Sequence, residues 1–313
     1  MPLNFSLVID HTDTMKGAKL ESVKEAIKMI IDRLEPTDYI SLVIFSDTAQ
    51  IIIPAMPAND KRRMKNAIEK ISVANLASRT MSLGMIQGLS ELRRWNIPNA
   101  VNRMILSTIG VTYGDADLCR QLARDAREAG ISIYPLGIGQ DWDESLLDTI
   151  GELSDGMPAE FIRNPADAIS VFEQKLQSAV AVEVRNATLT LHLPALVSPR
   201  KAVKVLPFVR DIDQSAVSDR QVVIPLGDLE KDTPQSVLVE LMLDPRPPGL
   251  VRIALAELTY DVPIANIVGE RLRSDVTVTF TTDANHAAQV NVEVMNIAEN
   301  VNRITHWQAS VQD

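Results

Sequence analysis

The chain has 313 residues, of which 46% are hydrophobic and 23% are charged, and its formal net charge at pH 7 is −10. This length suggests about two domains, and the composition is that of a globular protein with enough apolar side chains for a core. The acidic balance argues against a nucleic acid or an anionic membrane as a partner, because phosphate binding needs basic residues. The single cysteine, Cys119, excludes an internal disulfide bond and a cysteine-based zinc site.

The beginning of the chain resembles a strand and lacks the features of a secretory signal. No apolar run reaches the roughly 20 residues that span a bilayer. We therefore expect a cytoplasmic protein without a membrane-spanning segment, whose natural chain can continue beyond Asp313.

The first 181 residues alternate between strand and helix patterns. In chain order, the apolar spacing predicts strand 3–9, helix 19–34, strands 39–45 and 50–53, helices 60–71 and 83–95, strand 103–106, helix 116–129, strand 132–136, and helices 144–153 and 166–179. Strands that alternate with helices of this length predict a doubly wound, mainly parallel α/β sheet. We assign residues 1–181 to this domain.

After residue 182 the helical pattern stops and alternating strands take over. They cover residues 187–193, 201–208, 221–226, 236–243, 251–260 and 275–281. Turn signals separate them at Pro199, Gly227-Asp228, 244–249 and Asp261. This spacing is typical of an antiparallel β-sandwich, which we assign to residues 182–284.

The last segment comprises residues 285–313, and its apolar spacing predicts a C-terminal amphipathic helix. Its apolar positions are Val290, Val294, Ile297, Val301 and Ile304, which lie three or four residues apart. Such a stripe can dock on the body of its own chain. It can also contact a helix of another chain, and self-association is then possible.

An Asp-x-Thr-x-Thr triplet, Asp10, Thr12 and Thr14, directly follows the first predicted strand. It places one carboxylate and two hydroxyls at the carboxyl end of that strand, where doubly wound sheets bind ligands. A hard cation such as Mg²⁺ takes oxygen ligands of this kind. The same residue types also form ordinary turns and helix caps, so the triplet alone allows either interpretation.

The surroundings of the triplet resemble a von Willebrand factor type A domain over about residues 3–178. The similarity rests on the run Asp10-x-Thr12-x-Thr14-Met15-x-Gly17, on Arg33-Leu34-x-Pro36-x-Asp38, and on Val43-x-Phe45-Ser46. The β-rich segment resembles the companion domain of bacterial intracellular proteins of this type. The resemblance implies a metal-ion-dependent adhesion site, with Asp-x-Ser-x-Ser on one loop, a threonine on a second and an aspartate on a third. A partner's carboxylate can complete the coordination of its cation.

The second and third loops depart from that pattern. Aligning residues 77–85 with the family's Gly-Gly-Thr-x-Ile-x-x-Gly-Leu puts Arg79 at the ligand position, whereas a slip of one residue would restore Thr80. The family's Leu-Thr-Asp-Gly corresponds to residues 107–110, where Ile109 replaces the acid. Asp115, further along, is expected to lead the helix that begins at residue 116.

These changes leave three interpretations of the site. In the first, Arg79 fills the cation position and pairs with Asp10 in bidentate geometry, so that the site is a metal-free remnant. In the second, Mg²⁺ remains bound by Asp10, Thr12, Thr14 and Thr80. An Arg79 that lies on a solvated loop, with Asp10 merely capping, is a third interpretation.

No nucleophile with a matching base is recognisable, so we predict a non-enzymatic module that binds or scaffolds other proteins. A hydrolase that uses the metal on phosphates is the alternative, and the acidic charge argues against it. The expected partner is a protein at the strand-end loops, with contacts from His11, Arg79, Thr80, Ile109 and Tyr113, and with Val111 as a further apolar anchor. Cys119 is expected to be a small packed side chain.

Overall fold

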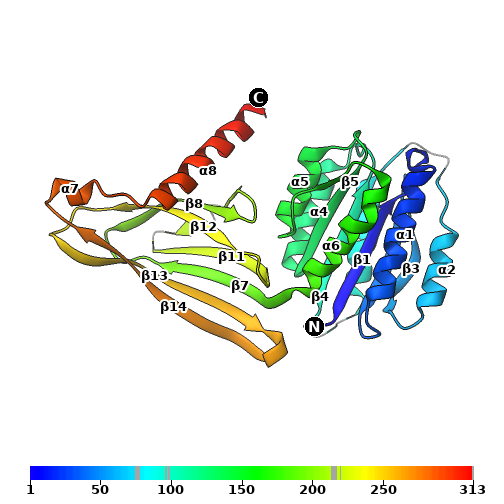
Figure 1. Ribbon diagram of the computed structural model, residues 1–313, viewed down its shortest axis with the longest axis horizontal. Helices are drawn as coiled ribbons and strands as arrows, with labels where there is room; N and C mark the ends of the chain where they lie inside the picture. The colour runs from blue at the N-terminus through cyan, green and yellow to red at the C-terminus, as the bar shows by residue number, and fades with distance from the viewer. Residues whose placement is uncertain (75–77, 96, 98, 213–216, 219, 312–313) are drawn as a thin grey trace. The chain divides into compact units, whose positions relative to one another are not determined.

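The computed structural model describes residues 1–311 except 75–77, 96, 98, 213–216 and 219. The chain divides into two compact units, Met1–Ala181 and Val182–Asp313 (Figure 1). No helix in the described part of the chain is both long enough and apolar enough to cross a membrane.

The first unit is built on a six-stranded sheet with the order β3-β2-β1-β4-β5-β6. All neighbouring strands are parallel except β2 and β3, which are antiparallel. The predicted doubly wound sheet is thereby confirmed. The strands are β1 Leu3–Asp10, β2 Tyr39–Phe45, β3 Ala49–Pro57, β4 Val101–Thr108, β5 Ile131–Ile138 and β6 Glu160–Ile162. The sequence pattern missed β6, which is too short to show a period.

Helices cover both faces of this sheet. They are α1 Ala18–Arg33, α2 Lys61–Glu69, α3 Met81–Arg93, α4 Ala116–Glu128, α5 Glu144–Leu153 and α6 Ala168–Val180. On one face, α3, α4 and α5 share a core with β1, β2, β4 and β5. Helix α1 packs against α6 and α2.

Two glycines let α3 approach the sheet closely. A Cβ atom on Gly88 would lie 2.5 Å from Cγ2 of Val8, and one on Gly84 would lie 2.7 Å from Cδ1 of Phe45. Contacts this short do not occur between real carbon atoms, so a side chain at either position would push the helix away. The start of α3 is therefore fixed close to the carboxyl ends of β1 and β2.

The second unit contains two antiparallel sheets that share an apolar core. The five-stranded sheet has the order β10-β11-β7-β13-β14, and the three-stranded sheet has the order β12-β8-β9. The bounds are β7 Val182–His192, β8 Val197–Leu206, β9 Arg210–Asp211, β10 Val217–Ser218, β11 Gln221–Glu230, β12 Ser236–Leu243, β13 Gly249–Val262 and β14 Ile267–Phe280.

Three of the predicted turn signals lie inside strands. Pro199 in β8, Gly227-Asp228 in β11 and Asp261 in β13 all sit where the pairing register shifts. A β-bulge accepts a proline or a glycine because its extra residue leaves the regular ladder of hydrogen bonds. The expectation that these residues separate strands was therefore wrong.

The C-terminal segment is not one continuous helix. A short helix, α7 Ala284–Ala287, comes first, and α8 Val292–Val311 follows. The side chain of Asn291 accepts hydrogen bonds from the backbone N–H groups of Glu293 and Val294, which starts α8 there and leaves Val290 outside it. Within α8, Val301 is buried, whereas Val294 is exposed.

Candidate functional site

The three loops of interest converge at the carboxyl ends of β1 and β4. These strands are parallel neighbours, and Ile9 pairs with Ser107, so Asp10 and Thr108 end their strands side by side. Residues 78–80 lead into α3, whose position against β1 brings them to the same place. Parallel strands gather their following loops at one edge in this way.

Asp10 is the centre of the site and is 0% exposed. Its Oδ1 accepts hydrogen bonds from the backbone N–H of Thr12 at 2.9 Å and from its hydroxyl at 2.7 Å. Its Oδ2 accepts from Nε of Arg79 at 2.7 Å, from the Thr108 hydroxyl at 3.1 Å and from the Ile109 N–H at 3.2 Å. Both oxygens are therefore fully engaged within the protein.

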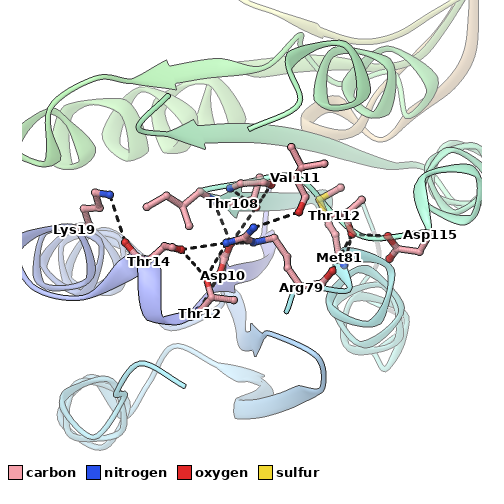
Figure 2. A network of polar contacts seen from close by, with 12 residues as sticks. Asp10, Thr12, Thr14, Lys19, Arg79, Met81, Thr108, Val111, Thr112 and Asp115 are labelled. Atoms are coloured by element: carbon pink, nitrogen blue, oxygen red, sulfur yellow. Dashed lines mark hydrogen bonds and ion pairs between the residues drawn. The ribbon is translucent and has the colours of Figure 1, made fainter. Parts of the chain in front are cut away.

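Arg79 lies at the position that the alignment assigned to a metal ligand, and it is 4% exposed. Its Nη2 donates to the hydroxyls of Thr12 at 2.9 Å and Thr14 at 3.1 Å, and its Nη1 donates to the carbonyl of Val111 at 3.2 Å. Figure 2 shows the guanidinium among the loops that carry these groups. The expected bidentate geometry is absent, because Nη2 binds the two hydroxyls and only Nε contacts the carboxylate.

The hydroxyl hydrogens can be placed from this pattern. An ionised carboxylate such as that of Asp10 can accept hydrogen bonds but cannot donate them. The single hydroxyl hydrogen of Thr12 is therefore donated to Asp10. The 2.9 Å contact between the Thr12 and Thr14 hydroxyls must then have Thr14 as its donor. Each hydroxyl also accepts from Arg79, so every polar group in the chain of contacts from Asp10 to Thr14 has a matched partner.

A second set of contacts holds Arg79 in place. Its carbonyl accepts a hydrogen bond from the N–H of Tyr113 at 3.1 Å. Gly110 provides the space for the guanidinium, since a Cβ atom there would lie 2.3 Å from Nη1 of Arg79. The glycine in the family's third-loop pattern was the sequence signal for this contact.

Asp115 has a different role from the expected one. Its carboxylate accepts from the N–H of Ser82 at 2.7 Å, in the first turn of α3, and from the Thr112 hydroxyl. It precedes α4 but makes no side-chain cap for that helix. Because Asp115 and Ser82 are far apart in sequence, no local pattern could have predicted that this carboxylate caps α3.

The oxygen atoms that would coordinate a divalent cation already take part in hydrogen bonds. The oxygens of Asp10, Thr12 and Thr14 accept hydrogen bonds from the Arg79 guanidinium. At position 109, where the family pattern has an acid, Ile109 contributes a backbone N–H that binds Asp10. Within the described residues, no three His, Cys, Asp or Glu side chains gather as a metal-binding group. The residues present at this site fit a guanidinium and do not fit Mg²⁺.

The residues expected to contact a partner are placed very differently. Tyr113 is 64% exposed and lies on the loop that Arg79 holds. His11 and Thr80 are half-buried. Arg79 and Ile109 are buried, at 4% and 3% exposure. A partner cannot reach these side chains, so the prediction that they contact a partner was wrong. Ile109 directly follows β4, and its N–H donates to Asp10.

Cys119 is buried in the core of the first unit, as expected of a packed side chain. Burial raises the pKa of its thiol well above the ordinary value, and the neighbouring Asp115 carboxylate raises this pKa further. A thiol with a raised pKa is a poor nucleophile. The geometry of Cys119 is that of a packed core side chain.

We expect the substitution Arg79→Ala to lower the free energy of unfolding by about 3–5 kcal/mol, because it leaves the buried Asp10 carboxylate without its counter-charge. Urea denaturation followed by circular dichroism measures this loss. Gly110→Ala should destabilise the protein in the same direction, since its methyl group displaces the guanidinium.

Arg124→Ala on the exposed surface of α4 is the matched control and should change stability by less than about 0.5 kcal/mol. The double variant Asp10→Asn with Arg79→Met removes both charges and should recover part of the loss. A stability of Arg79→Ala equal to that of Arg124→Ala would show that the buried pair does not hold this site together.

Comparison with known proteins places the chain in a family. A family model for the von Willebrand factor type A domain matches residues 4–175. An uncharacterized protein of Synechocystis sp. is 29% identical over 311 residues, which cover 96% of this chain and 72% of that protein. The inter-alpha-trypsin inhibitor heavy chain H1 of Bos taurus is 29% identical over 165 residues, which cover 49% of this chain and 18% of that protein.

The fold recurs in a solved structure. A von Willebrand factor type A protein from Catenulispora acidiphila superposes with a TM-score of 0.82 at 19% sequence identity, over 95% of this chain and 71% of that one. The matched family model, the mainly parallel sheet and the Asp-x-Thr-x-Thr loop at its carboxyl edge agree with one another. The chain belongs to the von Willebrand factor type A domain family.

Proposed function

We propose that this chain binds another protein through the strand-end loops of its first unit, without a divalent cation. The family is one of protein-interaction modules. The observation that carries the proposal is the Arg79 guanidinium, which binds Asp10, Thr12 and Thr14 at the place where the family pattern has a metal. We propose no cofactor, no enzymatic activity and no nucleic-acid or membrane partner, and cytoplasmic location stays a prediction.

In the family pattern, a partner's carboxylate completes the coordination of the bound cation. Arg79 does not offer a partner that contact, since its hydrogen bonds go to groups of this chain and it is buried. Binding must then use the side chains that surround the pair. Tyr113 is the strongest candidate, because an exposed aromatic side chain supplies a large contact area with few rotatable bonds.

Arg79 also fixes the loop that carries Tyr113. Its Nη1 binds the carbonyl of Val111, and its own carbonyl binds the N–H of Tyr113. The exposed side chains of Val111 and Tyr113 are thereby held in one arrangement before a partner arrives. Pre-ordering a binding loop lowers the entropy that binding has to overcome.

A calorimetric titration with Mg²⁺ and with Mn²⁺ tests whether the site binds metal. We expect no saturable heat from the unmodified protein, because the Arg79 guanidinium already uses the oxygens that a cation needs. Asp10→Asn is the control variant. A saturable heat that Asp10→Asn abolishes would instead support binding of the cation by Asp10, Thr12, Thr14 and Thr80.

A photo-cross-linking amino acid at position 113 tests the docking surface in lysates of the source organism. We expect it to capture a defined partner protein in lysates with excess EDTA as efficiently as in lysates with Mg²⁺. The same amino acid at position 169, an exposed isoleucine on α6, is the control and should not capture that protein. Capture that requires Mg²⁺ would contradict a metal-independent interaction.

Self-association through the C-terminal helix is a second candidate interaction. Val292, Val294 and Met295 are exposed on α8, while Val301 is buried. Sedimentation at increasing protein concentration should show reversible dimers that Val294→Glu removes, because a buried charge opposes helix packing. A constant monomer mass at all concentrations would exclude this contact.

A further inference from the structure

A groove with a volume of about 790 Å³ lies between β3 and α2 in the first unit. We call it the β3 groove. One side is formed by residues 50–52 of β3 with Ile44 of the neighbouring β2, and the other by residues of α2 and of the segment 70–74 that follows it. His11 lies at the end of this groove that is nearest to Asp10, with its Nδ1 3.2 Å from the carbonyl of Ser72.

The β3 groove lies beside the outermost strand of its sheet. Strand β3 is the outermost strand of its sheet, and β2 is its pairing partner among the described residues. Three consecutive residues of β3, 50–52, line the groove together with Ile44 of β2, and the register with β2 shifts here, so that Ile52 is the extra residue of a β-bulge. At such an edge, one row of backbone N–H and C=O groups lacks a strand partner and can pair with an added chain.

The walls of the groove suit the side chains of an extended peptide. Ile51 is 38% exposed and Ile52 is half-buried, so both present β-branched apolar surface beside the free edge. Ile71 and Val73 add apolar surface from the opposite side. A strand that adds to β3 would direct alternate side chains onto these walls.

The charge of the groove selects among peptides. Arg62, Arg63 and Lys70 line it and are exposed, and Asp60 is its acidic member. Asp60 already caps α2 by accepting a hydrogen bond from the backbone N–H of Arg63 at 3.0 Å. In the described part of the chain, the side chains of the three cations have no ion pair or hydrogen bond, although the chain carries a net charge of −10.

The other face of α2 provides an internal comparison. Lys61 donates to the carbonyls of Asp32 and Leu34, and Lys65 forms an ion pair with the Asp32 carboxylate. The cations of α2 that face α1 are thus engaged, while those that face the groove are open to a ligand. An uncompensated cluster of positive charge attracts a partner of opposite charge.

We propose that the β3 groove binds an extended, acidic peptide segment of another protein. The segment adds to β3 as a further strand, and its carboxylates meet Arg62, Arg63 and Lys70. The β3 groove is a different surface from the loops around Tyr113, so this inference does not depend on the function proposed above. A single-stranded nucleic acid fits the groove less well, because no aromatic side chain lines it for base stacking and phosphates gain nothing from the isoleucine wall.

Selection from a random-peptide display library against the full chain tests the proposal. We expect the enriched peptides to be rich in Asp, Glu and β-branched residues and to lack proline in their centre. Binding of the synthesised peptides, followed by fluorescence anisotropy, should weaken at least about tenfold in the double variant Arg62→Glu with Arg63→Glu.

The matched control is the double variant Arg120→Glu with Arg124→Glu on α4, which makes the same change in net charge away from β3. It should bind the peptides as the unmodified chain does. Circular dichroism establishes that both double variants are folded. Tyr113→Ala should also bind normally, which separates a failure of this proposal from a failure of the loop surface.

Hydrogen exchange distinguishes strand addition from simple charge attraction. A bound peptide should slow the exchange of amides in β3 but not of those in β6, at the opposite edge of the sheet. The proposal is overturned if the selected peptides bind the Arg62→Glu, Arg63→Glu variant as tightly as the unmodified chain, or if β3 gains no protection. It is also overturned if no acidic peptide is enriched, whether or not a single-stranded oligonucleotide binds through Arg62 and Arg63.

Discussion

The buried ion pair between Arg79 and Asp10 is the interaction on which the strand-end loops of the first unit depend. Asp10 has no contact with solvent, and a carboxylate in that position requires a counter-charge and hydrogen-bond donors. Arg79 supplies the charge, and Thr12, Thr108 and Ile109 supply further donors. The pair thus ties together the loops that follow β1 and β4 and the segment that leads into α3.

A guanidinium and a hydrated divalent cation would organise these loops in different ways. A cation binds and leaves according to its concentration, and its open coordination position is available to a partner. The Arg79 side chain is part of the chain, its planar group has fixed donor directions, and here those donors point at Asp10, two hydroxyls and the Val111 carbonyl. Under the proposed function, the loop surface is therefore permanently formed, and specificity has to come from the side chains exposed on it.

The second unit shows why local signals can mislead. Proline, glycine and aspartate at Pro199, Gly227 and Asp261 have the chemistry of turns, but each lies at a bulge within a continuing strand. Turns and bulges both leave the regular ladder of backbone hydrogen bonds, so they favour the same residues. Only the pairing with neighbouring strands distinguishes the two, and this pairing is a long-range property.

The sequence alone determined the architecture of both units and the place of the triplet Asp10, Thr12 and Thr14, because apolar periodicity and a run of matched motifs are local properties. It also pointed to Arg79 as the residue at the altered ligand position. The tertiary structure decided which donor meets which acceptor: Nε of Arg79 on Asp10, Asp115 on the start of α3, and Gly110 as the space beneath the guanidinium. It also revealed the cationic groove beside β3, whose residues have no recognisable motif. These features depend on distances between segments that are far apart in the chain, and such distances are set only when the helices and strands pack together.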